Sequence, residues 1–205
     1  MSDRTIAAIS AGLNQPSSTR LLADRLADAT VTELEMRGLT ATVETFELRD
    51  VAHEILNAML TGFPSGDLRA VLESVTGADG LIAVTPLFTT TYSGLFKTFV
   101  DILDKDSLEG VPVMLGATGG TARHSLALEY SMRPLFTYLH ADVARTSLFA
   151  ATDDWSGEDD ARGGLHTRIR RAGREFAEMV AGHEKAVPID LYTDAPTFDQ
   201  MFGQL

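Results

Sequence analysis

The sequence predicts a doubly wound α/β fold, in which a five-stranded parallel sheet carries helices on both faces. Two observations lead to this class. Segments with strand-like patterns alternate with segments of helical periodicity along most of the chain. The strand-like segments include short apolar runs, such as residues 79–84, which are typical of buried strands. Such alternation builds a parallel sheet through right-handed crossovers, and residues 1–185 are expected to form one domain.

The first half of the chain contains two predicted strands and three predicted helices. Residues 6–10 are mostly apolar and form the first strand, and apolar positions recur at helical spacing over 17–37. Gly38 suits the C′ position that ends this helix. Residues 41–48 alternate polar and apolar side chains, as an outer, half-exposed strand does. The other helices in this half are expected at 55–60 and 66–75.

The second half continues the same alternation. The buried strand at 79–84 is followed by a loop and then by a strand at 111–118, with proline near its start, where proline is tolerated. Residues 142–150 are the candidate for the fifth strand. The helices between and after these strands are expected at 94–103, 121–139 and 165–181.

Residues 186–205 are predicted to form a tail outside this domain. Phe198, Met201, Phe202 and Leu205 are spaced at i, i+3, i+4 and i+7, which places them on one apolar helical face. A helix this short needs a partner surface, so the tail is expected to dock on its own domain or on a neighbouring subunit.

Composition narrows the function classes. The formal net charge of -12 and the pI of about 4.7 argue against nucleic acid or anionic membranes as partners. The sequence has no apolar run long enough to cross a membrane and no pattern of a signal peptide at its start. Cysteine is absent, which excludes disulfides, thiol catalysis and thiolate metal ligands. We therefore expect a cytoplasmic protein without a metal centre.

Three loops that follow predicted strands carry candidate binding residues, and an open α/β sheet gathers such loops at one edge. The first loop ends in Ser17, Ser18 and Thr19, which open the helix at 17–37. Hydroxyls beside the free N–H groups of a helix start suit a phosphate. The alternative is that one of them only caps the helix. Neither a Walker A nor a G-x-G-x-x-G pattern is present.

The second loop, T-P-L-F-T-T-T-Y-S at 85–93, has many hydroxyls, free backbone groups and no charge. This composition suits a flat, uncharged, hydrogen-bonding ring system such as an oxidised flavin. The backbone would meet the polar edge of the ring while Leu87 and Phe88 cover one face. The alternative is a polar turn between strand and helix. Lys97 and Asp101, one helical turn apart on the following helix, are expected to form a weak structural ion pair.

The third loop contains Thr118-Gly119-Gly120-Thr121, whose glycines let the backbone approach a ligand closely. Arg123 and His124 follow in the first turn of the next helix. His124 is expected to be structural, because hydride transfer to a flavin needs no protein base at that point. The sequence therefore predicts no catalytic side chain in this loop.

Together these segments resemble the NADPH-dependent FMN reductase family, of flavodoxin-like fold. The resemblance is closest to the reductases that supply two-component sulfonate monooxygenases and related flavin-dependent monooxygenases. It rests on Thr85-Pro86-Leu87-Phe88 running into a helix with Lys97 and Asp101, on Thr118-Gly119-Gly120, and on Arg133-Pro134. The resemblance implies FMN and either NADPH or NADH as cofactors, with no catalytic side chain and no metal.

The resemblance also implies a set of flavin-binding positions. They are Ser10, Leu13, Ser17, Ser18, Thr19, Pro86, Leu87, Phe88, Thr89, Thr118, Gly119, Gly120 and Thr121. Two of them depart from the family pattern. Leu13 stands where the family often has an arginine near the phosphate, and Phe88 stands where it has a tyrosine. Weaker retention of FMN is the expected result.

The implied activity is NAD(P)H:FMN oxidoreduction, with reduced flavin passed to a partner monooxygenase by a homodimer or homotetramer. Two alternatives share the loops: a quinone or azo reductase that retains FMN, and a non-catalytic electron-transfer module of flavodoxin type. In the sulfonate-type members the helix after T-G-G can carry a π-bulge. The sequence does not decide whether His124 or Tyr130 marks one, nor between NADH and NADPH.

Overall fold

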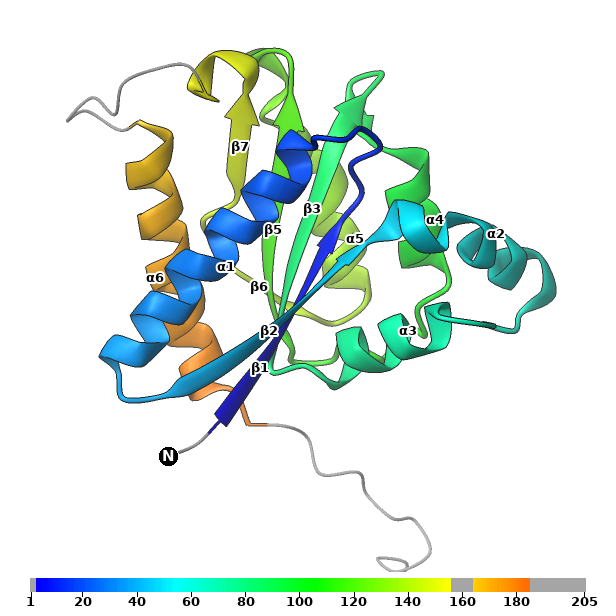
Figure 1. Cartoon of the computed structure of the whole chain (residues 1–205), viewed down its shortest axis with the longest axis horizontal. Helices are drawn as coiled ribbons and strands as arrows, with labels where there is room; N and C mark the ends of the chain where they lie inside the picture. The colour runs from blue at the N-terminus through cyan, green and yellow to red at the C-terminus, as the bar shows by residue number, and fades with distance from the viewer. Residues whose placement is uncertain (1–2, 156–163, 185–205) are drawn as a thin grey trace, which may run out of the picture.

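The computed structural model describes residues 3–155 and 164–184, so the predicted tail at 186–205 lies outside the described residues. A central sheet carries helices on both faces (Figure 1), which confirms the predicted class. The strands are β1 (Asp3–Ser10), β2 (Thr40–Glu47), β3 (Gly80–Phe88), β4 (Thr91–Tyr92), β5 (Pro112–Gly119), β6 (Asp142–Val143) and β7 (Leu148–Ala151). The α-helices are α1 (Ser18–Met36), α2 (Ala52–Thr61), α3 (Leu68–Gly77), α4 (Gly94–Asp101), α5 (Arg133–Tyr138) and α6 (Leu165–Gly182).

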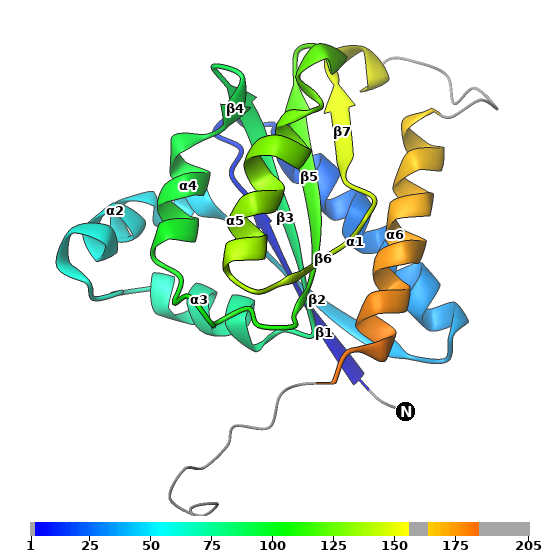
Figure 2. The ribbon, with the colours of Figure 1, turned by 180° about the vertical axis from the view of Figure 1, so that it is seen from behind.

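The parallel strands lie in the order β2-β1-β3-β5-β6, and β7 also pairs with β5, further along that strand than β6 does. Helices α1 and α6 pack on one face, and α2 to α5 pack on the other, as Figures 1 and 2 show from opposite sides. Alternate residues of β3 enter the two cores, Ile82 and Val84 on the α1 side and Leu81 and Ala83 on the other. Burial on both faces explains why this strand is a continuous apolar run.

Helix α1 ends where the sequence predicts. Gly38 has φ 76°, and its N–H donates to the carbonyl of Glu35, while the N–H of Leu39 donates to Leu34. This left-handed residue and its two hydrogen bonds form a Schellman ending. Among the described helices, none is both long and apolar enough to cross a membrane.

The predicted number of five strands is wrong, because the described residues form seven. The predicted strand at 142–150 is divided into β6 and β7. Between these two strands, side chains form hydrogen bonds with backbone groups that would otherwise pair with a neighbouring strand. The Arg133 guanidinium donates to the carbonyls of Ala144 (3.0 Å) and Arg145 (3.3 Å), and the Glu175 carboxylate accepts the N–H groups of Arg145 (2.8 Å) and Thr146 (3.1 Å).

The predicted helix at 121–139 is also wrong as one continuous element. A 3₁₀ turn at Ala122–His124 is followed by a π-helical turn at Leu128–Met132 and then by α5. Leu128 and Met132 are buried, whereas Tyr130 in the middle of the π turn is 78% exposed. Pro134 supplies a physical reason, because it lacks the N–H that an uninterrupted α-helix would donate to the Tyr130 carbonyl. Tyr130 thus marks a π turn, and His124 does not.

The second additional strand, β4, forms a hairpin with the end of β3. Leu87 pairs with Tyr92 and Phe88 with Thr91, so Thr89 and Thr90 are the two turn residues. Their φ angles are 49° and 73°. Positive φ at both positions is the type I′ geometry of a two-residue hairpin, which favours Asn-Gly and strains a β-branched residue.

Thr90→Gly is expected to raise the free energy of unfolding by about 1 kcal/mol, because glycine adopts φ 73° without a Cβ penalty. Urea unfolding of both proteins measures this change. Thr91→Gly is the control, since residue 91 lies in β4 and glycine weakens a strand. Equal destabilisation by both substitutions would contradict the strained turn.

Glu175 of α6 anchors the segment between β6 and β7. Burial raises the pKa of its carboxyl, but hydrogen bonds from the Thr146 hydroxyl (2.6 Å) and from the N–H groups of Thr146 and Arg145 outweigh burial and hold the pKa below its ordinary value. A depressed folded-state pKa stabilises the protein above the ordinary pKa of glutamate, and this stabilisation is lost as pH falls through the folded-state pKa.

Glu175→Gln is therefore expected to cost about 2 kcal/mol at pH 7, the loss of charge-assisted hydrogen bonds to the backbone. The difference from wild type should shrink as pH falls below about 4.3, the ordinary glutamate value. Urea unfolding at pH 7, 5 and 3 tests this. Glu178→Gln, one turn later on the exposed side of α6, is the control. A difference that stays constant over this pH range would refute the assignment.

Candidate functional site

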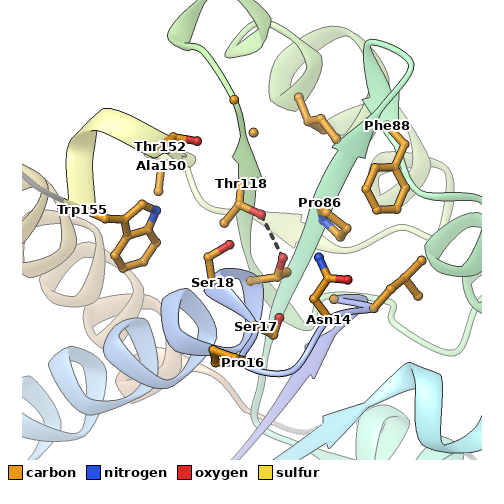
Figure 3. Close-up of a pocket in the computed structure, with 16 residues that line it drawn as sticks. Asn14, Pro16, Ser17, Ser18, Pro86, Phe88, Thr118, Ala150, Thr152 and Trp155 are labelled. Carbon is orange, nitrogen blue, oxygen red and sulfur yellow. Dashed lines mark hydrogen bonds between the residues drawn. The ribbon is translucent and has the colours of Figure 1, made fainter.

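A cavity of about 370 Å³ opens at the carboxyl edge of the sheet, where the loops after β1, β3, β5 and β7 meet (Figure 3). Its volume lies within the range of small-molecule sites. The lining residues are Gly12, Leu13, Asn14, Pro16, Ser17, Ser18, Thr19, Pro86, Leu87, Phe88, Thr118, Gly119, Gly120, Ala150, Thr152 and Trp155. Among the described residues, no charged side chain lines this cavity. Its chemistry is that of hydroxyls, backbone groups and apolar side chains.

The first wall is the loop from β1 into α1. The Ser17 hydroxyl accepts the Arg20 N–H at 3.1 Å, so Ser17 is the N-cap of α1. The Ser18 hydroxyl makes no hydrogen bond within residues 3–155 and 164–184 and is available to a ligand. Next to it the helix start presents free N–H groups, which favour an anion. Capping by Ser17 thus leaves the neighbouring Ser18 hydroxyl free to meet an anion.

This loop is held in place from two directions. The Arg49 guanidinium, which also pairs with Glu47 at 2.7 Å, donates to the Asn14 carbonyl at 2.7 Å. Gly12 lies so close to the start of α1 that a Cβ on it would overlap the Ser17 hydroxyl. The loop therefore presents a fixed backbone to the cavity, and Gly12 permits its tight course.

The second wall is the hairpin of β3 and β4, of which Pro86, Leu87 and Phe88 line the cavity. Two hydroxyls of the 85–93 loop form hydrogen bonds within the protein. Thr85 is buried, its Oγ1 accepting the Ser93 N–H at 3.1 Å, and Ser93 in turn caps α4 by accepting the Phe96 N–H. Thr89 and Thr90 form the turn, so a polar turn between strand and helix explains most of the hydroxyl-rich composition of this loop. The part of the loop that faces the cavity is mainly apolar.

The third wall is the end of β5. The hydroxyls of Thr118 and Thr19 are hydrogen-bonded at 2.8 Å, which ties this wall to α1 (Figure 3). A Cβ on Gly119 would meet the Phe149 ring at 2.9 Å, so glycine is needed for close packing there. Gly120 has open space in front of its Cα and presents bare backbone.

All but three of the predicted flavin-binding residues line this one cavity. Ser10 is fully buried behind the first loop, where its hydroxyl accepts the Gly12 N–H. Thr89 lies in the hairpin turn, and the Thr121 hydroxyl accepts the Arg123 N–H at the 3₁₀ turn after β5. These three residues support the loops from outside the cavity lining.

The sequence reasoning missed the fourth wall, formed by the end of β7 and the 3₁₀ turn η4 (Thr152–Trp155). Ala150, Thr152 and Trp155 line the cavity from this side. The rule that ligands bind beyond the carboxyl ends of strands applies equally to the fifth strand, and it was the available signal. Gly12, Asn14 and Pro16 of the first loop were also missed.

The charged residues near the cavity are engaged elsewhere or lie outside its lining. Arg20 donates to Asp24 at 2.8 Å and pairs with Glu47 at 3.4 Å, and the hydrogen bond to Asp24 raises the pKa of its guanidinium. Lys97 and Asp101 form the predicted ion pair at 2.5 Å. Within the two described ranges, no group of histidine and carboxylate side chains is arranged for a metal ion.

Sheet order and cavity define the class of protein. A doubly wound sheet in the order 2-1-3-4-5 binds FMN at the switch point between its first and third strands. This cavity occupies that point, between the loops after β1 and β3. The Ser18 hydroxyl and the start of α1 fit a phosphate. The uncharged walls formed by the hairpin and by the end of β5 fit a flavin ring. The molecule is a flavodoxin-like α/β protein.

The family described as NADPH-dependent FMN reductase matches residues 4–156. The chain belongs to this family, and the predicted NAD(P)H-dependent FMN oxidoreductase is confirmed, with FMN and NAD(P)H as its cofactors.

Relatives and solved structures agree with this assignment. The chain is 31% identical over 184 residues to "FMN reductase (NADPH)" of Pseudomonas aeruginosa, covering 90% of this chain and 96% of that protein. It is 32% identical to "NADH-dependent FMN reductase SfnF" of Pseudomonas putida, covering 72% and 77%. The structure of an oxidoreductase from Corynebacterium diphtheriae has a TM-score of 0.85 and 41% identity, covering 90% of this chain and 100% of that one.

Proposed function

We propose that the protein reduces FMN bound in this cavity with NADH or NADPH and releases reduced FMN to a partner monooxygenase. One observation carries the proposal. The cavity joins a hydroxyl-bearing helix start to an apolar hairpin, with no charged side chain among its described lining residues. Such walls suit a ligand that has a flat neutral ring at one end and an anionic group at the other.

In this proposal each wall has its own task. Ser17, Ser18 and Thr19 hold the phosphate through hydroxyls and free N–H groups of α1. Pro86 to Phe88 and Thr118 to Gly120 enclose the ring. Bound FMN supplies the hydride acceptor, and the protein contributes position and exclusion of water.

The solvent-exposed end of the cavity is where a second substrate would stack on the flavin ring. Leu13 is 52% exposed and Phe88 is 45% exposed, so the apolar walls at this end face solvent. An open ring site admits the nicotinamide of the coenzyme. No charged side chain is among the described lining residues, so release of reduced flavin breaks no ion pair between the cavity lining and the phosphate.

The proposal includes a homo-oligomer and a cytoplasmic location, where reduced nicotinamide coenzymes are available. Exposed apolar side chains on and beside α2 support self-association, since monomers seldom expose large apolar patches. They are Leu56 (52%), Met59 (52%), Leu60 (77%) and Phe63 (77%). Size-exclusion chromatography with light scattering measures the assembly.

Steady-state oxidation of NADH and of NADPH, each with and without added FMN, tests the activity. We expect a rate that depends on FMN and saturates with it. The absence of an FMN-dependent rate with either coenzyme would overturn the proposal. Saturating quinone without free FMN is the second arm, and fast turnover there would replace release of flavin by a reductase that retains it.

A further inference from the structure

Trp155 is a cavity residue that the proposed flavin site has not yet assigned. It is the last residue of η4, and its indole lies on the side of the cavity where α1 begins at Ser18 (Figure 3). Arg25 of α1 lies over this ring, with its Cζ 5.3 Å from the ring centroid. This distance is within the range of a cation–π interaction, which fixes both side chains relative to each other.

The segment that carries Trp155 is anchored from two elements. The Asp154 carboxylate accepts the Ala151 N–H at 2.8 Å and pairs with Arg168 of α6 at 2.6 Å. Arg168 also donates to the Phe149 carbonyl at 2.7 Å. Trp155 is therefore held by the residue before it and by Arg25, so its place at the cavity is fixed by the fold.

Arg25 brings a positive charge to this side of the site. It follows Ser18 at i+7, which places both residues on the same face of α1, two turns apart. Within residues 3–155 and 164–184 Arg25 forms no ion pair, although the chain carries a net charge of -12. An unneutralised guanidinium next to an otherwise uncharged cavity attracts an anionic group there.

We propose that Trp155, which lines the phosphate end of the cavity, and Arg25, which stacks on the Trp155 ring from outside the lining, make the protein prefer FMN over riboflavin. The inference rests on the proposed function, since it requires flavin in this cavity with the phosphate at the start of α1. The indole Nε1–H, for which the described residues offer no acceptor, provides a donor at this wall. Arg25 provides the charge and holds the ring.

The test compares dissociation constants for FMN and for riboflavin, measured by quenching of flavin fluorescence. Arg25→Met is expected to weaken FMN about fivefold at low salt and to leave riboflavin within about twofold, with the FMN effect reduced in 0.5 M salt. Trp155→Phe keeps the stacked ring but removes the N–H, and we expect a smaller loss confined to FMN. Arg174→Met is the control, because it removes an equal charge from the part of α6 beside Val143 and Thr146 rather than from the ring of Trp155.

Trp155 is the single tryptophan of the chain, so its emission follows flavin binding to the wild-type protein without any activity measurement. Equal losses for FMN and riboflavin in both variants, or no loss in either, would overturn the preference while the flavin site stands. Failure of the wild-type protein to bind FMN would overturn the proposed site itself. Circular dichroism of each variant excludes unfolding as the cause of a loss.

Discussion

Gly12→Ala is expected to weaken FMN binding at least tenfold and to lower the free energy of unfolding by about 1–2 kcal/mol. A Cβ on Gly12 would overlap the Ser17 hydroxyl and approach Thr19 Cβ at 3.1 Å. The Ser17 hydroxyl is fixed as the cap of α1, so relief of the overlap costs the cap. Both the phosphate wall and the bond from Thr19 to Thr118 are then displaced.

Flavin fluorescence titration and urea unfolding measure the two effects. Gly94→Ala is the control, since a Cβ there meets no atom within 4 Å and the residue lies away from the cavity. The double variant Gly12→Ala/Ser17→Ala removes the overlapping hydroxyl, so adding Gly12→Ala to Ser17→Ala should cost less stability than adding it to the wild type. A Gly12→Ala protein with wild-type affinity for FMN would contradict a phosphate site at the start of α1.

Phe96→Ala is expected to lower the free energy of unfolding by about 3–5 kcal/mol, the usual cost of a large cavity in a core. Phe96 is fully buried on α4, between Tyr92 of the hairpin and Phe136 of α5. Its ring centroid is 6.1 Å from that of Tyr92 and 6.2 Å from that of Phe136, in tilted arrangements. These three rings connect the hairpin wall to the helix after the π turn.

Thermal and urea unfolding measure this loss. Phe96→Leu keeps most of the volume and should cost less than half as much. Loss of the ring also removes support behind β4, so we expect weaker FMN binding by Phe96→Ala at temperatures where it stays folded. A loss below about 1.5 kcal/mol would show that the ring contributes little to this core.

The sequence was sufficient for those parts of the fold that depend on burial and local spacing. Strand β3 is buried on both faces, so its apolar run identifies it without knowledge of its neighbours. Gly38 ends α1 through a local conformation that glycine favours. The β3–β4 hairpin was not predictable in this way, because Thr89 and Thr90 are poor residues for positive φ and only the surrounding structure holds them there.

Long-range contacts also account for the other departures. The division of the predicted fifth strand depends on Glu175, which lies about 30 residues away in the chain. For the site, the rule for strand ends located three walls and their hydroxyls. The same rule points to the end of the fifth strand, but the place of Trp155 depends on the pairing of Asp154 with Arg168 and on the stacking of Arg25, and no local pattern reveals these partners.

The carboxylate of Glu175 has a consequence for the behaviour of the protein in concentrated solution. The segment between β6 and β7 lies at the border of the sheet, and open N–H groups at a sheet border are a template for strands of other molecules. Glu175 occupies two of these groups, those of Arg145 and Thr146, and places a negative charge beside them. The same side chain that divides the strand thereby disfavours intermolecular β-pairing, and its protonation, which its lowered pKa confines to pH values below the ordinary glutamate range, would open a route to aggregation.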